Sequence, residues 1–213
     1  DFRSGGFFGS TGEWVNPQMF ENILGQEEVV SDLRRLIGDA GLPTSLLFEG
    51  PAYSGKLTTA LELARAVSCV RGDAPWKCGC RSCRDHRLLI QPDTKILGYR
   101  EFMEEVAAAT DVVQRAASPA SGFLYVRAVR KVLKRLDPDL WGGQEPKYRA
   151  VGGTLEELGD LLESIQPDRE AVSDGSDSKT LERVGELTAK AAAAIPKDAI
   201  PVDQIRRLSQ WDH

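Results

Sequence analysis

A glycine-rich loop at residues 50–56 constrains the fold of this chain more than any other feature. It reads Gly-Pro-Ala-Tyr-Ser-Gly-Lys and fits the G-x-x-x-x-G-K part of the phosphate-binding pattern. The short apolar run Ser45–Glu49 before it predicts a buried parallel strand, and residues 58–70 after it have helical spacing. Strand, loop and helix in this order predict an α/β fold of the P-loop NTPase type.

Four residues of the loop are candidates for binding a nucleotide such as ATP or ADP: Gly50, Ser54, Gly55 and Lys56. Glycines let successive backbone amides turn toward phosphate oxygens, and the lysine would reach the outer phosphates. The alternative is an ordinary glycine turn with an exposed lysine. The flanking strand and helix favour the nucleotide site over that alternative.

The position after the lysine departs from the pattern. A Ser or Thr there ligates Mg²⁺ through its hydroxyl, but Leu57 has no oxygen to offer. Thr58 comes one residue later, about 100° further round the helix. No apolar strand that ends in paired acids follows, and Asp137-Pro138-Asp139, the nearest candidate, is rejected because it comes after a basic helical stretch. We therefore expect nucleotide binding with an incomplete Mg²⁺ site and without turnover.

All four cysteines of the chain lie close together in the sequence. Cys69, Cys78, Cys80 and Cys83 have the spacing C-x8-C-x-C-x2-C. Four thiolates suit a closed, tetrahedral structural Zn²⁺ site, and such crowding suits one metal better than a fold-wide disulfide framework. Four free or oxidised cysteines are the alternative.

The residues around the cysteines have two interpretations each. The arginines at 81, 84 and 87 could contact phosphate, but a solvated basic loop is the favoured interpretation. His86 could replace a cysteine as ligand. Because four thiolates already fill the coordination shell of zinc, we expect His86 at the surface or behind the ligands.

Composition excludes several classes of protein. With 32 acidic and 27 basic residues the net charge is −5, which argues against a strongly cationic nucleic-acid surface and against an independent zinc-dependent DNA-binding protein. No apolar run reaches the length of a membrane span, and the N-terminus lacks the order of a signal peptide. We expect a cytoplasmic protein without a membrane partner.

The remaining sequence is mostly helical in pattern. Residues 1–18 are rich in glycine and predict a cloning remnant or flexible arm, with Met19 as a native start. A turn followed by a helix after Gly25 is expected within 22–37, helices at 99–117, 123–136, 155–165, 181–194 and 202–211, and a second short strand at 95–97. Ser118-Pro119 predicts a break, and the polar residues 168–179 predict a mobile loop.

Several of these segments resemble a known family. Met19–Gln26, the loop at 50–56, the cysteines after its helix, Gln91-Pro92-Asp93 and Ile200–Arg206 occur in the order found in bacterial clamp-loader AAA+ subunits of DNA polymerase III. Together they cover about 95 residues. Within the family, Leu57 resembles the degraded loop of the delta prime subunit, whereas Pro17–Phe20 resembles the entry of the gamma/tau motor subunit.

The resemblance implies roles and boundaries. Residues 19–97 would be the first part of an AAA+ domain, with a zinc module at 69–83; residues 98–199 would be a helical insertion without a counterpart in the family, and 200–213 a return to the AAA+ domain that stops before its acidic motif. Leu24, Gly25 and Gln26 would border the adenine, and Thr58 would belong to the nucleotide site. The resemblance also implies that the chain assembles with the gamma/tau and delta subunits into a nucleoid-associated hetero-pentamer. This complex would load the sliding clamp onto primed DNA.

Overall fold

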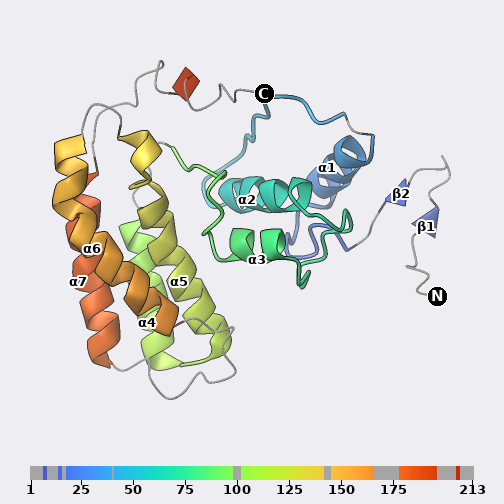
Figure 1. Cartoon of the computed structure of the whole chain (residues 1–213). Helices are drawn as coiled ribbons and strands as arrows, with labels where there is room; N and C mark the ends of the chain where they lie inside the picture. Colours follow the sequence, from blue (N-terminus) through green and yellow to red (C-terminus); the bar gives the residue numbers. More distant parts are fainter. Residues whose placement is uncertain are drawn as a thin grey trace. The chain divides into compact units, whose positions relative to one another are not determined.

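The computed structural model describes residues 7–8, 14–15, 18–39, 41–97, 102–141, 145–165, 178–195 and 205–206. It divides into two compact units, Asp1–Arg87 and Leu88–His213 (Figure 1). None of the described helices has the length and apolar character needed to cross a bilayer.

In its described residues, the first unit has three helices and one pair of short strands. The helices are α1 (Glu27–Gly38), α2 (Lys56–Val67) and α3 (Arg81–Arg87), and the strands β1 (Phe7–Phe8) and β2 (Trp14–Val15) pair antiparallel. The buried residues that form its core are Met19, Phe20, Val30, Leu33, Leu63, Ala66, Cys69, Ala74, Cys78 and Cys83. Since three of the four cysteines are among them, the core and the candidate metal centre are continuous.

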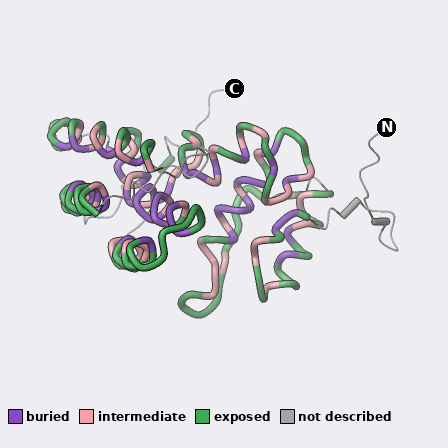
Figure 2. Tube along the Cα trace, turned by 90° about the horizontal axis from the view of Figure 1, so that it is seen from below, coloured by how far each residue is buried: buried purple, intermediate pink, exposed green. Residues whose placement is uncertain are grey.

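The part of the second unit that the structure describes contains a bundle of four long helices. These are α4 (Met103–Arg115), α5 (Pro119–Lys134), α6 (Glu145–Ser164) and α7 (Ser178–Ala194), with a short 3₁₀ helix η1 (Pro138–Leu140) after α5. Helix α7 packs against α4, α5 and α6, and α4 packs against α5. Figure 2 shows the buried positions along the inner sides of these helices. The expected mostly helical character of this region is confirmed.

The start of α5 follows directly from its sequence. The Ser118 side chain accepts a hydrogen bond from the Ser121 amide at 3.1 Å, and the Ser121 hydroxyl accepts one from the Ser118 amide at 2.9 Å. Pro119 occupies the first turn, where no amide donor is needed. The predicted break at Ser118-Pro119 is therefore the N-terminus of a helix with a reciprocal cap.

The expected parallel sheet is wrong for the described residues. Neither Ser45–Glu49 nor Lys95–Leu97 is a strand, and Leu47 is 82% exposed. A parallel strand is stable only beside partner strands, and the described part of the chain places none next to residues 45–49. Of the expected strand, loop and helix, the described residues show only the glycine loop and helix α2, and residues 45–49 before the loop form no strand.

Other boundaries also differ from expectation. In the segment 1–18, the described residues Phe7–Phe8 and Trp14–Val15 pair as β1 and β2, and the assignment of this segment to a cloning remnant or flexible arm stays a prediction. Helix α6 begins at Glu145, ten residues before the predicted start. The expected loop at 168–179 lies outside the described residues except for Ser178 and Lys179, which begin α7, and of the expected last helix only Ile205 and Arg206 are described, as helical.

Candidate metal centre and phosphate loop

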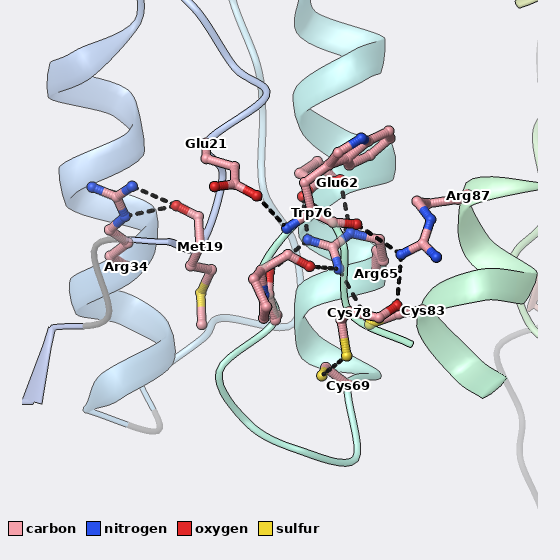
Figure 3. Close-up of polar contacts among 12 residues, drawn as sticks. Met19, Glu21, Arg34, Glu62, Arg65, Cys69, Trp76, Cys78, Cys83 and Arg87 are labelled. Carbon is pink, nitrogen blue, oxygen red and sulfur yellow. Dashed lines mark hydrogen bonds and ion pairs between the residues drawn. The ribbon is translucent and has the colours of Figure 1, made fainter. Parts of the chain in front are cut away.

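The four predicted metal ligands meet in one cluster. Cys69 follows the end of α2, Cys78 and Cys80 lie in the next loop, and Cys83 is in α3. Their four Sγ atoms all lie within 4.8 Å of one another. Those of Cys69 and Cys78 are 3.8 Å apart, and Figure 3 shows these two with Cys83. Three of these cysteines are buried and Cys80 is partly buried, and none is in a disulfide.

This geometry fits Zn²⁺. With Zn–S bonds of about 2.3 Å, the sulfur atoms of a tetrahedral site lie about 3.8 Å apart. The Cys69–Cys78 separation has this value, and it is far longer than the roughly 2.05 Å of a disulfide. Four sulfur ligands leave no open coordination position, so a zinc ion here would fix the loop and would not activate water.

The thiols have different environments. Burial opposes ionisation of Cys80, but hydrogen bonds from the Cys83 amide and from the thiols of Cys83 and Cys78 lower its pKa to about 7. Burial raises the pKa of Cys78 and of Cys83. A buried thiol ionises more readily beside positive charge, and the guanidinium of Arg65 donates a hydrogen bond to the Cys83 sulfur.

Arg65 is the centre of the contacts around the metal cluster. It is 1% exposed, and its Nη1 donates to the Cys83 Sγ at 3.2 Å and to the Pro75 carbonyl at 3.1 Å. Its Nη2 donates to the Ala74 carbonyl at 2.7 Å, and its Nε donates to the buried Glu62 carboxylate at 3.0 Å. Burial lowers the pKa of Arg65, but Glu62 and Cys83 more than compensate, so the pKa is raised.

A second arginine closes the same loop from α3. Arg87 Nη1 donates to the carbonyls of Trp76 at 2.7 Å and Cys78 at 2.8 Å, and the Trp76 amide donates to Glu21 at 2.8 Å. The guanidinium groups of Arg65 and Arg87 lie 5.7 and 5.9 Å from the Trp76 ring centre. These contacts attach the loop 74–78 to α2, to α3 and to the segment before α1.

The other residues around the cysteines have ordinary roles. Arg81 and Arg84 are exposed and pair with Asp85 at 3.5 and 3.9 Å, as expected for a solvated basic face. Arg87 was predicted to belong to that face and instead binds backbone carbonyls. His86 is only 6% exposed and lies outside the four-sulfur group, so the surface alternative for it is wrong.

The loop at residues 50–56 folds back on its own lysine. Lys56 Nζ donates to the Gly50 carbonyl at 2.8 Å and also to the Pro51 carbonyl, and it lies 3.4 Å from the Ser54 Oγ. Gly50 and Gly55 have positive φ of 147° and 84°. Tyr53 also has a positive φ, 62°, where a glycine would be unstrained, and its side chain is exposed.

The structure brings part of the predicted nucleotide site together. Gln26 Nε2 lies 3.4 Å from the Ser54 carbonyl, so the segment before α1 borders the loop, while Leu24 is exposed. Leu57 is partly buried and the Thr58 side chain is exposed in the first turn of α2, followed by the buried Thr59. The assignment of these residues to a nucleotide stays a prediction.

Asp137 and Asp139, which were rejected above as the second acidic motif of an ATPase, form ion pairs with a lysine. Asp137 and Asp139, at the start of η1, accept hydrogen bonds from Lys95 Nζ at 2.7 and 2.6 Å. These ion pairs therefore connect Lys95 to the start of η1, just after α5, within the second unit.

Sequence reasoning missed Glu62, Arg65 and Trp76. A signal was available in the sequence for two of them, because Glu62, Arg65 and Cys69 recur at helical spacing and place an ion pair on the face that carries the first cysteine. The partners of Trp76 depend on how the loop closes and have no local signal.

Comparisons with known proteins give one family model and several relatives that match part of the chain. The family model described as DNA polymerase III, delta subunit, matches residues 25–132, just over half of the chain. The replication factor C small subunit of Methanothermobacter thermautotrophicus is 42% identical over 59 residues, which cover 26% of this chain and 18% of that protein. DNA polymerase III subunit gamma/tau of Mycobacterium tuberculosis is 35% identical over 68 residues, 32% of this chain and 12% of the relative.

A third relative extends the similarity. DNA polymerase III subunit tau/gamma of Haemophilus influenzae is 32% identical over 100 residues, 42% of this chain and 14% of the relative. No solved structure is significantly similar to the chain. The matched segments span less than a fifth of the length of these three relatives. Because the family model covers more than half of the sequence, the chain belongs to the clamp-loader family described as DNA polymerase III, delta subunit.

Proposed function

We propose that this chain is part of a delta prime subunit of the DNA polymerase III clamp loader, in which it acts as a stator. In this role it joins the gamma/tau and delta subunits in a hetero-pentamer that loads the sliding clamp on primed DNA in the cytoplasm. The family match and the similarity to gamma/tau subunits support a place in this complex. The identity as delta prime depends on the phosphate loop.

The observation that carries the proposal is the sequence Lys56-Leu57 at the start of α2. Leu57 stands where a hydroxyl would ligate Mg²⁺, and the neighbouring Thr58 points to solvent on a different side of the helix. Loss of this ligand weakens neutralisation of the transferring phosphoryl group more than it weakens phosphate binding by the backbone amides and Lys56. A subunit of this kind grips a nucleotide without hydrolysing it.

The bonds of Lys56 within the loop agree with a static role. Its ammonium group donates to the carbonyls of Gly50 and Pro51, which lie in the loop itself. A nucleotide must break these bonds before Lys56 can reach its phosphates. This cost lowers the affinity for nucleotide and lets the loop keep its shape without one.

The zinc module would add rigidity to the same domain. A bound Zn²⁺ would supply a closed set of four Zn–S bonds, held by Cys69, Cys78, Cys80 and Cys83. The Arg65 and Arg87 contacts already attach the module to α2 and α3. We infer that the helical residues 98–199 are an insertion in this AAA+ domain, carried as a separate bundle.

A gamma/tau-type motor subunit is the second candidate. Two of the three relatives described above are gamma/tau subunits, and Pro17–Phe20 resembles their entry sequence. This function requires ATP hydrolysis, and therefore requires Thr58 or another group to complete the Mg²⁺ site.

Calorimetric titration of the full chain with ATP, with and without Mg²⁺, separates the two candidates. The stator predicts an affinity that Mg²⁺ changes less than threefold, and no hydrolysis. Leu57→Thr should then introduce Mg²⁺ dependence, whereas Leu57→Val, which changes size without adding an oxygen, should not. An unmodified chain whose ATP affinity rises tenfold or more with Mg²⁺ would contradict the stator and support the motor subunit.

A further inference from the structure

The helical bundle contains a pocket to which the proposed function assigns no role. Its volume is about 370 Å³, within the range of small-molecule sites, and it lies entirely in the second unit. Helix α5, helix α6, the start of η1 and residues 89–90 line it.

Two helix faces and a missing side chain create this space. Arg130, Leu133 and Lys134 lie on one face of α5, because residues three and four apart are neighbours on a helix. Leu155 and Leu162 line the opposite wall from α6, with Gly159 between them. Gly159 is exposed and contributes no side chain to the pocket wall, and a Cβ added there would meet no atom within 4 Å outside its own helix backbone.

The walls are mostly apolar, but two cations line them. Arg130 is 7% exposed and Lys134 is 8% exposed. Among the described residues, Arg130 makes one hydrogen bond, to the Leu88 carbonyl at 3.0 Å, and Lys134 makes one, to the Gln91 carbonyl. Both cations are therefore bound to neutral acceptors and to no carboxylate.

The acidic residues at the pocket do not neutralise these cations by contact. Asp137 accepts its ion pair from Lys95 at 2.7 Å, and Glu163 is exposed and forms no ion pair with Arg130 in the structure. Burial lowers the pKa of Arg130 and of Lys134, although Glu163 and Asp137 raise them in part. A buried cation without a paired anion is costly, and an anion placed beside it removes that cost.

We propose that this pocket binds a small amphiphilic carboxylate, whose apolar chain lies against Leu133, Leu155 and Leu162 and whose carboxylate pairs with Lys134 and Arg130. Charge complementarity selects the anion and the leucine walls select an apolar body. A fully polar anion such as inorganic phosphate would leave the leucines in contact with a charged group and is excluded by the same argument.

The test uses octanoate as the probe and the ¹⁵N-labelled full chain in an NMR titration. We expect saturable binding, with the largest shifts at the amides of residues 89, 133, 159 and 162. Octylammonium and octanol have the same chain without the negative charge and should bind at least tenfold more weakly. Inorganic phosphate should cause no saturable shift at these amides.

Two variants with matched controls locate the site. Gly159→Leu places a side chain at the pocket wall and should weaken octanoate binding at least tenfold, whereas Gly153→Leu, an equally exposed position of α6 that does not line the pocket, should leave it unchanged. Lys134→Met keeps the apolar wall and removes a charge-assisted hydrogen bond, which corresponds to a loss of about tenfold or more. Lys190→Met makes the same charge change at an exposed position of α7 and should have no effect.

Each contrary result overturns the proposal. Equal affinity for octanoate and octylammonium would show a nonspecific apolar surface. Unchanged binding in a folded Gly159→Leu variant would place octanoate elsewhere, and absence of saturable binding to the unmodified chain would exclude the site. Thermal melting of each variant shows whether it is folded. None of these results bears on assembly with clamp-loader subunits.

Discussion

The Nη1 of Arg65 lies 3.2 Å from the Sγ of Cys83, and the same guanidinium binds Glu62 and the carbonyls of Ala74 and Pro75. Arg65 thus links α2, the loop of the cysteine cluster and the sulfur of a candidate metal ligand. Together with Arg87, which binds the Trp76 and Cys78 carbonyls, it attaches this loop to its neighbouring helices.

Replacement of Arg65 should destabilise the first unit strongly. Arg65→Met leaves Glu62 buried without its partner, and breaking a buried pair in this way costs about 3–5 kcal/mol. The double variant Glu62→Leu/Arg65→Met removes the stranded charge and should recover part of the loss. Urea denaturation measures both, with the exposed Arg84→Met as control. A loss below about 1 kcal/mol in Arg65→Met would contradict the role assigned to this residue.

Zinc removal should affect the first unit and spare the helical bundle. We expect one Zn²⁺ per chain, released to a coloured chelator, and less than one tenth of that amount in Cys78→Ser. Ser68→Ala, next to Cys69, should keep full zinc content. After chelation, the helical signal of the bundle should persist in circular dichroism while the first unit becomes sensitive to protease. Full zinc content in Cys78→Ser would exclude the four-sulfur site.

The Lys95 ion pairs should make the bundle sensitive to alkaline pH. Burial opposes the charge on Lys95, but hydrogen bonds to Asp137 and Asp139 raise its pKa above the ordinary value. A raised folded-state pKa means that the stabilisation is complete below about pH 10 and is lost as the pH rises through the folded-state pKa.

The check is the difference in unfolding free energy between the unmodified chain and Lys95→Met at several pH values. This difference should be constant from pH 7 to pH 9 and should shrink as the pH rises above about 10.5. The comparison cancels the titration of groups common to both proteins. If the difference in unfolding free energy instead increased as the pH rose above about 10.5, the result would contradict the Lys95 ion pairs.

Tyr125 should stabilise the bundle through its hydroxyl. The group is buried and donates to the Leu181 carbonyl at 3.2 Å, so it links α5 to α7. Tyr125→Phe should cost about 1 kcal/mol in urea denaturation because the carbonyl loses its donor in a buried place. Tyr53→Phe, whose hydroxyl is in solvent, is the control and should change stability by less than about 0.3 kcal/mol. Equal effects of the two variants would contradict this role for Tyr125.

Features of local origin could be predicted from the sequence. The cap at Ser118 and Pro119 depends on residues within one helical turn, and the cysteine cluster is visible from spacing alone. Helix α6 was predicted too short because Gly152 and Gly153 each cost about 1 kcal/mol in a helix. Burial of the neighbouring Val151 and Thr154 outweighs this propensity.

Features that depend on distant residues could not be predicted. The strand expected at Ser45–Glu49 needs partner strands, and none lies beside it in the described residues. Arg65 binds carbonyls nine and ten positions away in a loop whose path no local pattern fixes. The pocket in the bundle exists only where faces of α5 and α6 leave space, and no single segment encodes it.

The measurement that tests the central claim most directly is assembly with the gamma/tau and delta subunits of the same genome, followed by native mass spectrometry. A stator subunit predicts one copy of this chain in a ring with three gamma/tau and one delta subunit, formed with ATP or without it. Absence of any complex, or a ring in which this chain replaces the gamma/tau copies, would contradict the account.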